Sequence, residues 1–113
     1  MDYRHYVIVR NDLTKYSTGA LIAQGIHSTL YAFSTLTTPA SLSYLKHPEQ
    51  MTTIVLQCTL AQIQELAKQL EEQKVPHRLW IEQPENEPTS LSLLPISPSD
   101  PICRLLKKYP LYK

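Results

Sequence analysis

Tyr6-Val7-Ile8-Val9 is a run of aromatic and β-branched residues that predicts a strand, and we expect this strand to end at Arg10. The turn Asn11-Asp12-Leu13 follows, and ten residues after Leu13 a predicted helix carries Ala23-Gln24-Gly25-Ile26-His27. Sites on open α/β sheets form beyond the carboxyl ends of the strands. Asp12 and His27 are therefore expected to lie close enough to share a water, from which they take a proton.

The rest of the chain alternates between strand and helix patterns. Strands are predicted over residues 3–10, 52–58, 77–82 and 89–94, and helices begin near residues 19, 39, 60 and 101. Ser17-Thr18-Gly19 supplies capping chemistry for the first helix, and Thr59 with Gln62 three residues later fits a capping box at the start of the third. In the first helix an apolar stripe recurs at four- and three-residue steps, which is typical of an amphipathic helix that packs on a sheet. The stripe consists of Ile22, Ile26, Leu30 and Phe33.

These patterns predict a single α/β domain over residues 1–113, with helices packed on a mixed four-stranded sheet in the order β-α-α-β-α-β-β-α. Only residues 83–88 join the last two strands, which is too short for a helical crossover, so these strands are expected to be antiparallel. Apolar residues make up 42% of the chain and charged residues 19%, an ordinary globular composition.

The composition also bears on location and cofactors. No apolar run approaches the roughly 20 residues that span a bilayer, and the first residues lack an apolar signal core, so we expect a cytoplasmic protein with no membrane partner. Cys58 and Cys103 are expected to be reduced thiols. His5, His47 and His77 lack metal-ligand spacing and are expected at the surface, and neither a metal nor an organic cofactor is implied.

Charge is unevenly distributed although the net charge is only +1. Three glutamates occur between residues 82 and 87 with no basic residue among them, whereas the segment after Asp100 is purely basic. Its basic residues are Arg104, Lys107, Lys108 and Lys113. They are suited to contact with phosphates, and a solvated helix face explains them equally well.

The N-D-L turn after the first strand and the A-Q-x-x-H helix together resemble the start of the type-two, archaeal and eukaryotic, peptidyl-tRNA hydrolases. The segment L-W-I-E-Q-P-E-N at residues 79–86 resembles a later signature of the divergent peptidyl-tRNA hydrolase domain-containing proteins. The resemblance covers about residues 4–113. It implies hydrolysis of the ester between a peptidyl group and the terminal ribose of tRNA, and it implies a homodimer.

Carried over to this chain, the resemblance assigns His27 and Asp12 to the orientation and deprotonation of water. Glu82 stands where the family has an aspartate and would complete the polar ring, and the amino end of the first helix would stabilise the oxyanion. Thr89 matches a threonine that opens the family's fourth strand. The residues that would contact substrate or tRNA are Lys15, Thr18, Thr89, Arg104, Lys107 and Lys108.

Besides Glu82 in place of an aspartate, two further departures from the family pattern keep other functions open. The glycine-lysine run after D-L is replaced by residues 14–20, where only Lys15 is charged, and the loop after Glu82 is shortened and lacks its arginine. These losses favour a catalytically silent member that binds RNA or a protein partner, or an esterase for a smaller substrate. Alternatively, these residues have only structural roles. Asp12 then caps a turn, His27 lies on a helix surface, and Trp80 packs in the core rather than stacking on a nucleobase.

The homodimer that the resemblance implies also has a physical argument in this sequence. The chain has four predicted helical segments, two of them short, and they give the second and fourth strands limited cover. One sheet face or helix flank is therefore expected to keep an apolar surface that a second copy of the chain would bury. The alternative is that the C-terminal segment Leu111-Tyr112-Lys113 folds back over this surface and leaves a monomer.

Overall fold

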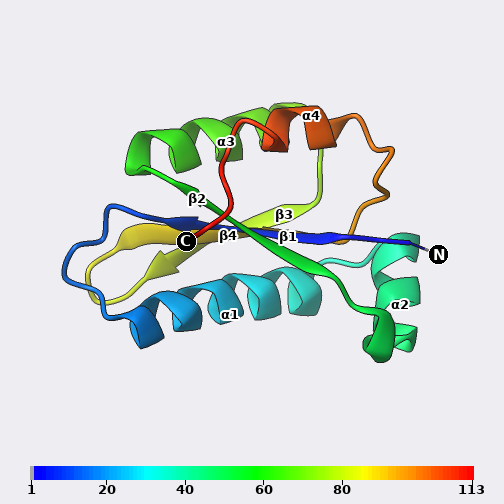
Figure 1. Ribbon diagram of the computed structural model, residues 1–113, viewed down its shortest axis with the longest axis horizontal. Coiled ribbons are helices and arrows are strands. Elements are labelled where there is room, and N and C mark those ends of the chain that lie inside the picture. Colours follow the sequence, from blue (N-terminus) through cyan, green and yellow to red (C-terminus); the bar gives the residue numbers. More distant parts are fainter. Residues whose placement is uncertain (1) are drawn as a thin grey trace.

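A computed structural model describes residues 2–113 as a four-stranded sheet with helices on both faces (Figure 1). The predicted order of strands and helices is confirmed, with one short 3-10 turn added. In chain order the elements are β1 (His5–Arg10), α1 (Thr18–Thr35), α2 (Pro39–Lys46), η1 (Pro48–Gln50), β2 (Thr53–Cys58), α3 (Leu60–Glu72), β3 (His77–Glu82), β4 (Glu87–Leu93) and α4 (Ile102–Leu106).

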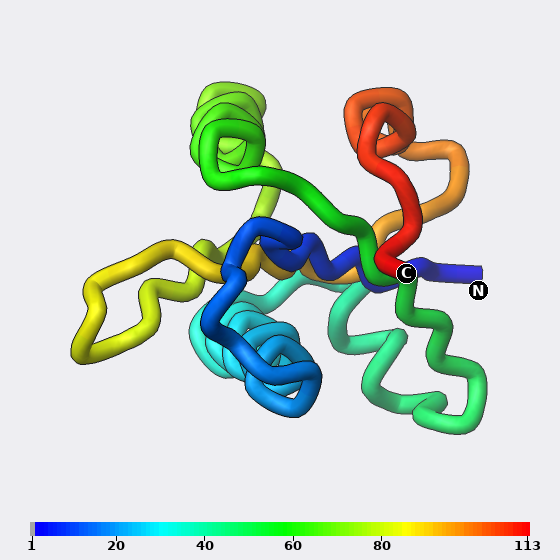
Figure 2. Tube along the Cα trace, turned by 60° about the vertical axis from the view of Figure 1, so that its left-hand side comes forward, coloured from blue at the N-terminus to red at the C-terminus, as the bar shows by residue number. Residues whose placement is uncertain are grey.

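The sheet has the strand order β2-β1-β4-β3 and is mixed, as predicted. β1 and β2 are parallel, whereas β4 is antiparallel to both β1 and β3. Two views agree that α3 and α4 cover one face and that α1 and α2 lie on the other (Figures 1 and 2). Among the described residues, no helix combines the length and the apolar character that a membrane crossing requires.

Helix α1 packs on the sheet through small and polar residues, which reverses the expected orientation of its apolar stripe. Its buried residues are Gln24, Ser28 and Ala32. A Cβ added to Gly25 would lie 3.5 Å from a methyl group of Val7, so the backbone of α1 runs close to β1. Small side chains permit this approach, and they leave the large apolar side chains on the outer face of the helix.

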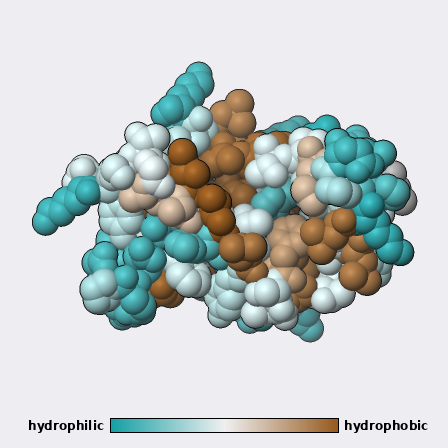
Figure 3. All heavy atoms as spheres, turned by 90° about the horizontal axis from the view of Figure 1, so that it is seen from below, coloured by the Kyte–Doolittle hydropathy of each residue, from teal (hydrophilic) through white to brown (hydrophobic). Residues whose placement is uncertain are grey.

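The outward stripe of α1 is strongly exposed. Ile22, Ile26 and Leu30 have exposed fractions of 61%, 53% and 62%. Figure 3 views the molecule from below, the side on which α1 and α2 lie, and apolar atoms form a band across that surface. The expectation that this stripe packs against the sheet is therefore wrong, although Phe33 at its end is partly buried.

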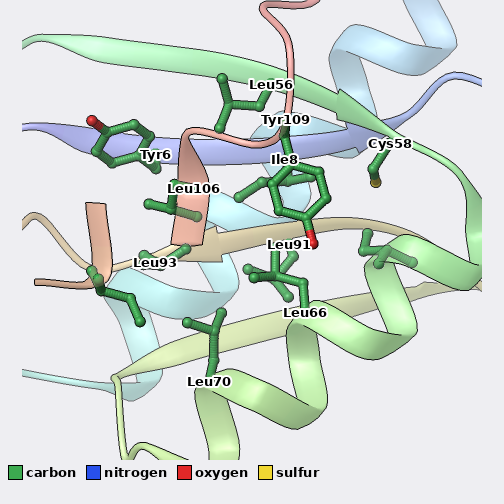
Figure 4. Packing of buried hydrophobic residues seen from close by; sticks show 12 residues of the cluster. Tyr6, Ile8, Leu56, Cys58, Leu66, Leu70, Leu91, Leu93, Leu106 and Tyr109 are labelled. Atoms are coloured by element: carbon green, nitrogen blue, oxygen red, sulfur yellow. The ribbon is translucent and has the colours of Figure 1, made fainter. Parts of the chain in front are cut away.

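The main apolar core lies on the opposite face, between the sheet and the layer of α3 and α4 (Figure 4). Every second residue along the strands and one face of α3 point into this space. Its fully buried members include Ile8, Ile63, Leu66, Leu70, Leu91 and Leu93. Thr59 and Gln62 form the predicted capping box at the start of α3 and hold this helix over the core.

The C-terminal segment runs along the free edge of β2 as an irregular extra strand. The N–H of Gln57 donates to the carbonyl of Pro110 at 2.9 Å, and the N–H of Tyr112 donates to the carbonyl of Val55 at 2.9 Å. The segment therefore covers a sheet edge, which removes an exposed template for strand pairing. It does not cover the apolar stripe of α1, whose residues Ile22, Ile26 and Leu30 remain exposed on one face of the molecule.

Candidate functional site

A buried glutamine organises the polar residues between α1 and the ends of β3 and β4. Gln24 is only 2% exposed. Its side-chain oxygen accepts from the hydroxyl of Thr89 at 2.8 Å, and its side-chain nitrogen donates to Glu82 Oε2 at 3.2 Å. The hydroxyl of Ser90 also donates to its backbone carbonyl at 2.6 Å. These bonds tie one turn of α1 to the two antiparallel strands.

A bulge explains why two consecutive residues of β4 reach the same helix. The register pairs Trp80 with Ser90 but pairs the next residue, Ile81, with Pro88, which leaves Thr89 as an extra residue in β4. Without this irregularity Thr89 and Ser90 would point to opposite faces of the sheet. Bulges often redirect side chains near functional sites, and this one turns Thr89 toward Gln24.

His27 lies on the exposed flank of α1, beside the same cluster. Its ring stacks on the indole of Trp80 with centroids 5.1 Å apart and planes inclined by 33°. The Trp80 indole donates from Nε1 to Glu82 Oε1 at 3.0 Å. His27, Glu82 and Thr89, all predicted as site residues, are thus linked through Trp80 and Gln24. No hydrogen bond joins His27 directly to Glu82 within residues 2–113.

Asp12 has a different set of partners. One carboxylate oxygen accepts from Arg10 Nε at 2.8 Å, and the other accepts from the N–H of Leu60 at 3.0 Å. Burial by itself would raise the pKa of Asp12, but the hydrogen bonds from Arg10 and Leu60, together with the charge of Arg10, lower it below its usual value. Asp12 is therefore an ionised carboxylate that caps the start of α3.

Asp12 and His27, which the sequence suggested as a water-sharing pair, have no hydrogen-bond partner in common among residues 2–113. Asp12 turns toward the first N–H groups of α3, which lack acceptors within their own helix. His27 lies on α1, and α1 and α3 cover opposite faces of the sheet (Figure 1). The arginine at the end of β1 strengthens this arrangement, because its buried guanidinium also donates to Glu87 and to the carbonyl of Pro88.

The amino end of α1 also lies apart from His27. Ser17 caps this helix by accepting from the N–H of Ala20, which confirms the capping chemistry expected at residues 17–19. Thr18 precedes His27 by nine residues, which is about 13 Å along a helix axis. One tetrahedral centre beside His27 cannot meet those N–H groups, so the predicted role of this helix end for the oxyanion is not supported.

The predicted basic residues do not gather around His27. Lys15 and Thr18 are exposed in and after the turn that leads into α1. Arg104 lies in α4, and Lys107 and Lys108 follow it, so these three belong to the layer on the opposite face of the sheet (Figure 1). There Arg104 and Lys107 line a hollow of about 530 Å³ together with Arg4.

Three glutamates lie near Tyr16, at the edge of the polar residues that surround Gln24. The hydroxyl of Tyr16 is buried and has no hydrogen-bond partner among residues 2–113. Burial raises its pKa, and the charges of Glu85, Glu82 and Glu87 raise it further. Tyr16 therefore keeps its proton and offers a donor close to these glutamates. Neither Tyr16 nor Gln24 was selected from the sequence as a site residue, although Gln24 belongs to the A-Q-x-x-H motif.

Comparisons with known proteins match nearly the whole chain to one family. The model of the family described as peptidyl-tRNA hydrolase PTH2 matches residues 3–112. The mouse and human proteins named "Putative peptidyl-tRNA hydrolase PTRHD1" are each 34% identical to this chain over 114 aligned residues. Each alignment covers 96% of this chain and 81% of the relative.

Proposed function

The chain belongs to the peptidyl-tRNA hydrolase PTH2 family, and on this premise we propose that it hydrolyses the ester between a peptidyl group and tRNA. The peptidyl or N-blocked aminoacyl group would leave the 3′-terminal ribose of tRNA in the cytoplasm, without a metal or an organic cofactor. The observation that carries this proposal is the linkage of His27, Glu82 and Thr89 through Trp80 and Gln24 in a chain of this family.

In this proposal His27 is the general base. Its ring is exposed to solvent on one side and held by Trp80 on the other, so a nitrogen can accept a proton from water that attacks the ester. Glu82 acts as a positioning residue, because it fixes the Trp80 indole through Nε1. Gln24 and Thr89 hold Glu82 in turn, and Asp12 contributes to folding rather than to the reaction.

Purified peptidyl-tRNA tests the proposal directly. The wild-type protein should release deacylated tRNA and free peptide over many turnovers, at a rate well above spontaneous hydrolysis of the ester. Binding of tRNA without any release would contradict the proposal and would identify a catalytically silent family member. The placement of Asp12 between Arg10 and the start of α3 is the observation that favours this second candidate, because His27 then has no hydrogen-bonded carboxylate partner among residues 2–113.

We also propose that the basic residues near α4 contact phosphates of the tRNA body. Lys107 and Lys108 are exposed, and Lys107 borders the hollow that holds Arg4 and Arg104. Each phosphate contact releases counterions, so removing a lysine should lower the slope of log affinity against log salt by roughly 0.7–0.9. A salt series with Lys107→Ala/Lys108→Ala measures this slope, and a slope equal to that of the wild type would exclude these contacts.

We also propose that the protein forms a homodimer, with the outward stripe of α1 as its interface. Ile22, Ile26 and Leu30 form one exposed row, and large apolar patches on soluble proteins commonly mark association surfaces. Light scattering should give about twice the chain mass of 13.0 kDa for the wild type. Ile26→Asp should give the single-chain mass, because it places a charge in the buried centre of the interface.

Leu111→Asp is the matched control for this measurement. Leu111 is also an exposed apolar residue, but it belongs to the segment along the edge of β2. The Leu111→Asp protein should keep the mass of the wild type. A wild-type mass near 13.0 kDa at micromolar concentration would contradict the dimer.

A further inference from the structure

Four side chains from α1 and β3 form a continuous row at the outer edge of the sheet. His27 stacks on Trp80, and Tyr31 meets the same indole edge-to-face with centroids 6.0 Å apart. The guanidinium carbon of Arg78 lies 5.4 Å from the centre of the Tyr31 ring. We call these four residues the aromatic row. Their spacing, four residues in a helix and two in a strand, places each pair on one side of its element.

The aromatic row is not part of the main core. That core lies on the face covered by α3 and α4, and Trp80 is not among its members. His27 is exposed, Tyr31 is 39% exposed, and both Arg78 and Trp80 are only half-buried. β3 is an outer strand, so no further strand of the described part of the chain lies beside the row. The aromatic surface is therefore accessible from solvent.

The chemistry of the row is that of a stacking platform for nucleobases. Aromatic rings bind any base through its π-face, and a guanidinium can stack on a ring and pair with a phosphate. The Trp80 N–H is already bound to Glu82, so the indole presents its ring rather than a free donor. Single-stranded RNA is commonly recognised in this way, because its bases are free to leave their own stack.

The surrounding charge restricts which part of an RNA can bind. Glu82 touches the row, and Glu85 follows in the next turn, whereas Arg78 is the one basic member of the row. An acidic rim repels a duplex that carries many phosphates, but a short unpaired end brings only a few. The platform is therefore matched to an unpaired RNA end rather than to a helical stem.

We propose that the aromatic row binds the unpaired 3′-terminal bases of the tRNA substrate by stacking. The bases lie on the Trp80 and Tyr31 rings, and Arg78 meets a phosphate at the Tyr31 end of the row. The terminal ribose, which carries the ester, then lies at the His27 end of the row. This inference rests on the proposed function for the identity of its RNA, but base binding can be measured without hydrolysis.

The fluorescence of Trp80 gives a direct test, because Trp80 is the only tryptophan in the chain. Titration with the RNA trinucleotide CCA should quench this fluorescence in a saturable way. A ribose-phosphate chain of equal length without bases should leave the fluorescence unchanged. Equal quenching by both compounds would overturn the proposal. The absence of quenching by CCA at millimolar concentration would also overturn it, and this is the result expected if the row binds a protein instead.

Variants of the row extend the test with a fluorescein-labelled CCA oligonucleotide. Tyr31→Leu should raise its dissociation constant by about tenfold, because one stacked base contributes roughly that factor or more. Arg78→Gln should weaken binding and reduce its salt dependence. Lys68→Gln is the matched control, since Lys68 is exposed on α3, on the opposite face of the sheet, and it should leave CCA binding unchanged. An unaltered affinity of Tyr31→Leu would contradict the platform.

Kinetics separate the failure of this inference from the failure of the proposed function. With peptidyl-tRNA, Tyr31→Leu should raise KM about tenfold and change kcat by less than about threefold, because stacking positions the RNA end before the reaction. Hydrolysis with an unchanged KM would overturn the stacking proposal and leave the hydrolase intact. Saturable CCA binding without any hydrolysis would support the row and contradict the proposed function.

Discussion

His27→Ala is expected to lower kcat for peptidyl-tRNA hydrolysis by about 10²–10⁴-fold, whereas Asp12→Asn should lower it by less than about threefold. The reason is geometric. His27 is exposed beside Trp80 and can meet an attacking water, while both carboxylate oxygens of Asp12 are bound to Arg10 and to the start of α3. Steady-state release of peptide at saturating peptidyl-tRNA measures kcat for both variants under the same conditions.

Three control measurements make the comparison interpretable. Circular dichroism should show that both variants are folded, and thermal unfolding should show a loss of stability for Asp12→Asn, because Asp12 caps α3 and pairs with Arg10. CCA binding should remain measurable in both. Equal and large losses of kcat in the two variants would instead show that Asp12 takes part in the reaction, and the assignment of Asp12 to folding alone would be wrong.

The second large effect concerns stability in acid. His5 is 4% exposed, and burial lowers its pKa from 6.5 to about 4. The unfolded chain therefore takes up a proton at a higher pH than the folded chain does. His5 contributes its full stability above pH 6.5, and this contribution is lost as the pH falls toward 4. The difference between the two pKa values corresponds to about 3 kcal/mol of unfolding free energy.

Urea unfolding between pH 7 and pH 4 measures this loss. His5→Gln should remove most of the pH dependence between these values, whatever its effect on stability at pH 7. His47→Gln is the control, because His47 is exposed and its replacement should leave the pH dependence as in the wild type. A flat dependence in the wild type would contradict the burial of a neutral His5.

The burial of His5 also shows what a sequence pattern leaves undetermined. The sequence offered no partner for this residue, and a surface position was expected. In the structure Nε2 of His5 hydrogen-bonds to the hydroxyl of Ser92 at 2.9 Å, and Nδ1 hydrogen-bonds to that of Thr53 at 3.2 Å. Both partners lie far along the chain, on strands that flank β1. Their proximity depends on strand order, which local patterns do not contain.

Local patterns determined much of this protein. The runs of β-branched residues predicted the strands, the short loop after Glu82 predicted that the last two are antiparallel, and Thr59 with Gln62 predicted the start of α3. These features depend on residues close together in the chain, so they can be read from the sequence alone. Motifs distributed over the chain also identified the family, to which residues 3–112 were independently matched.

Tertiary structure alone decided which groups meet at the site. Helical periodicity located the apolar stripe of α1, but the close approach of Gly25 to β1 turned that stripe to solvent. Asp12 binds the N–H of a residue 48 positions away, and Gln24 reaches Glu82 over 58 positions. A bulge at Thr89 completes the cluster. Each contact depends on how elements distant in sequence pack together, because packing brings them within hydrogen-bond distance.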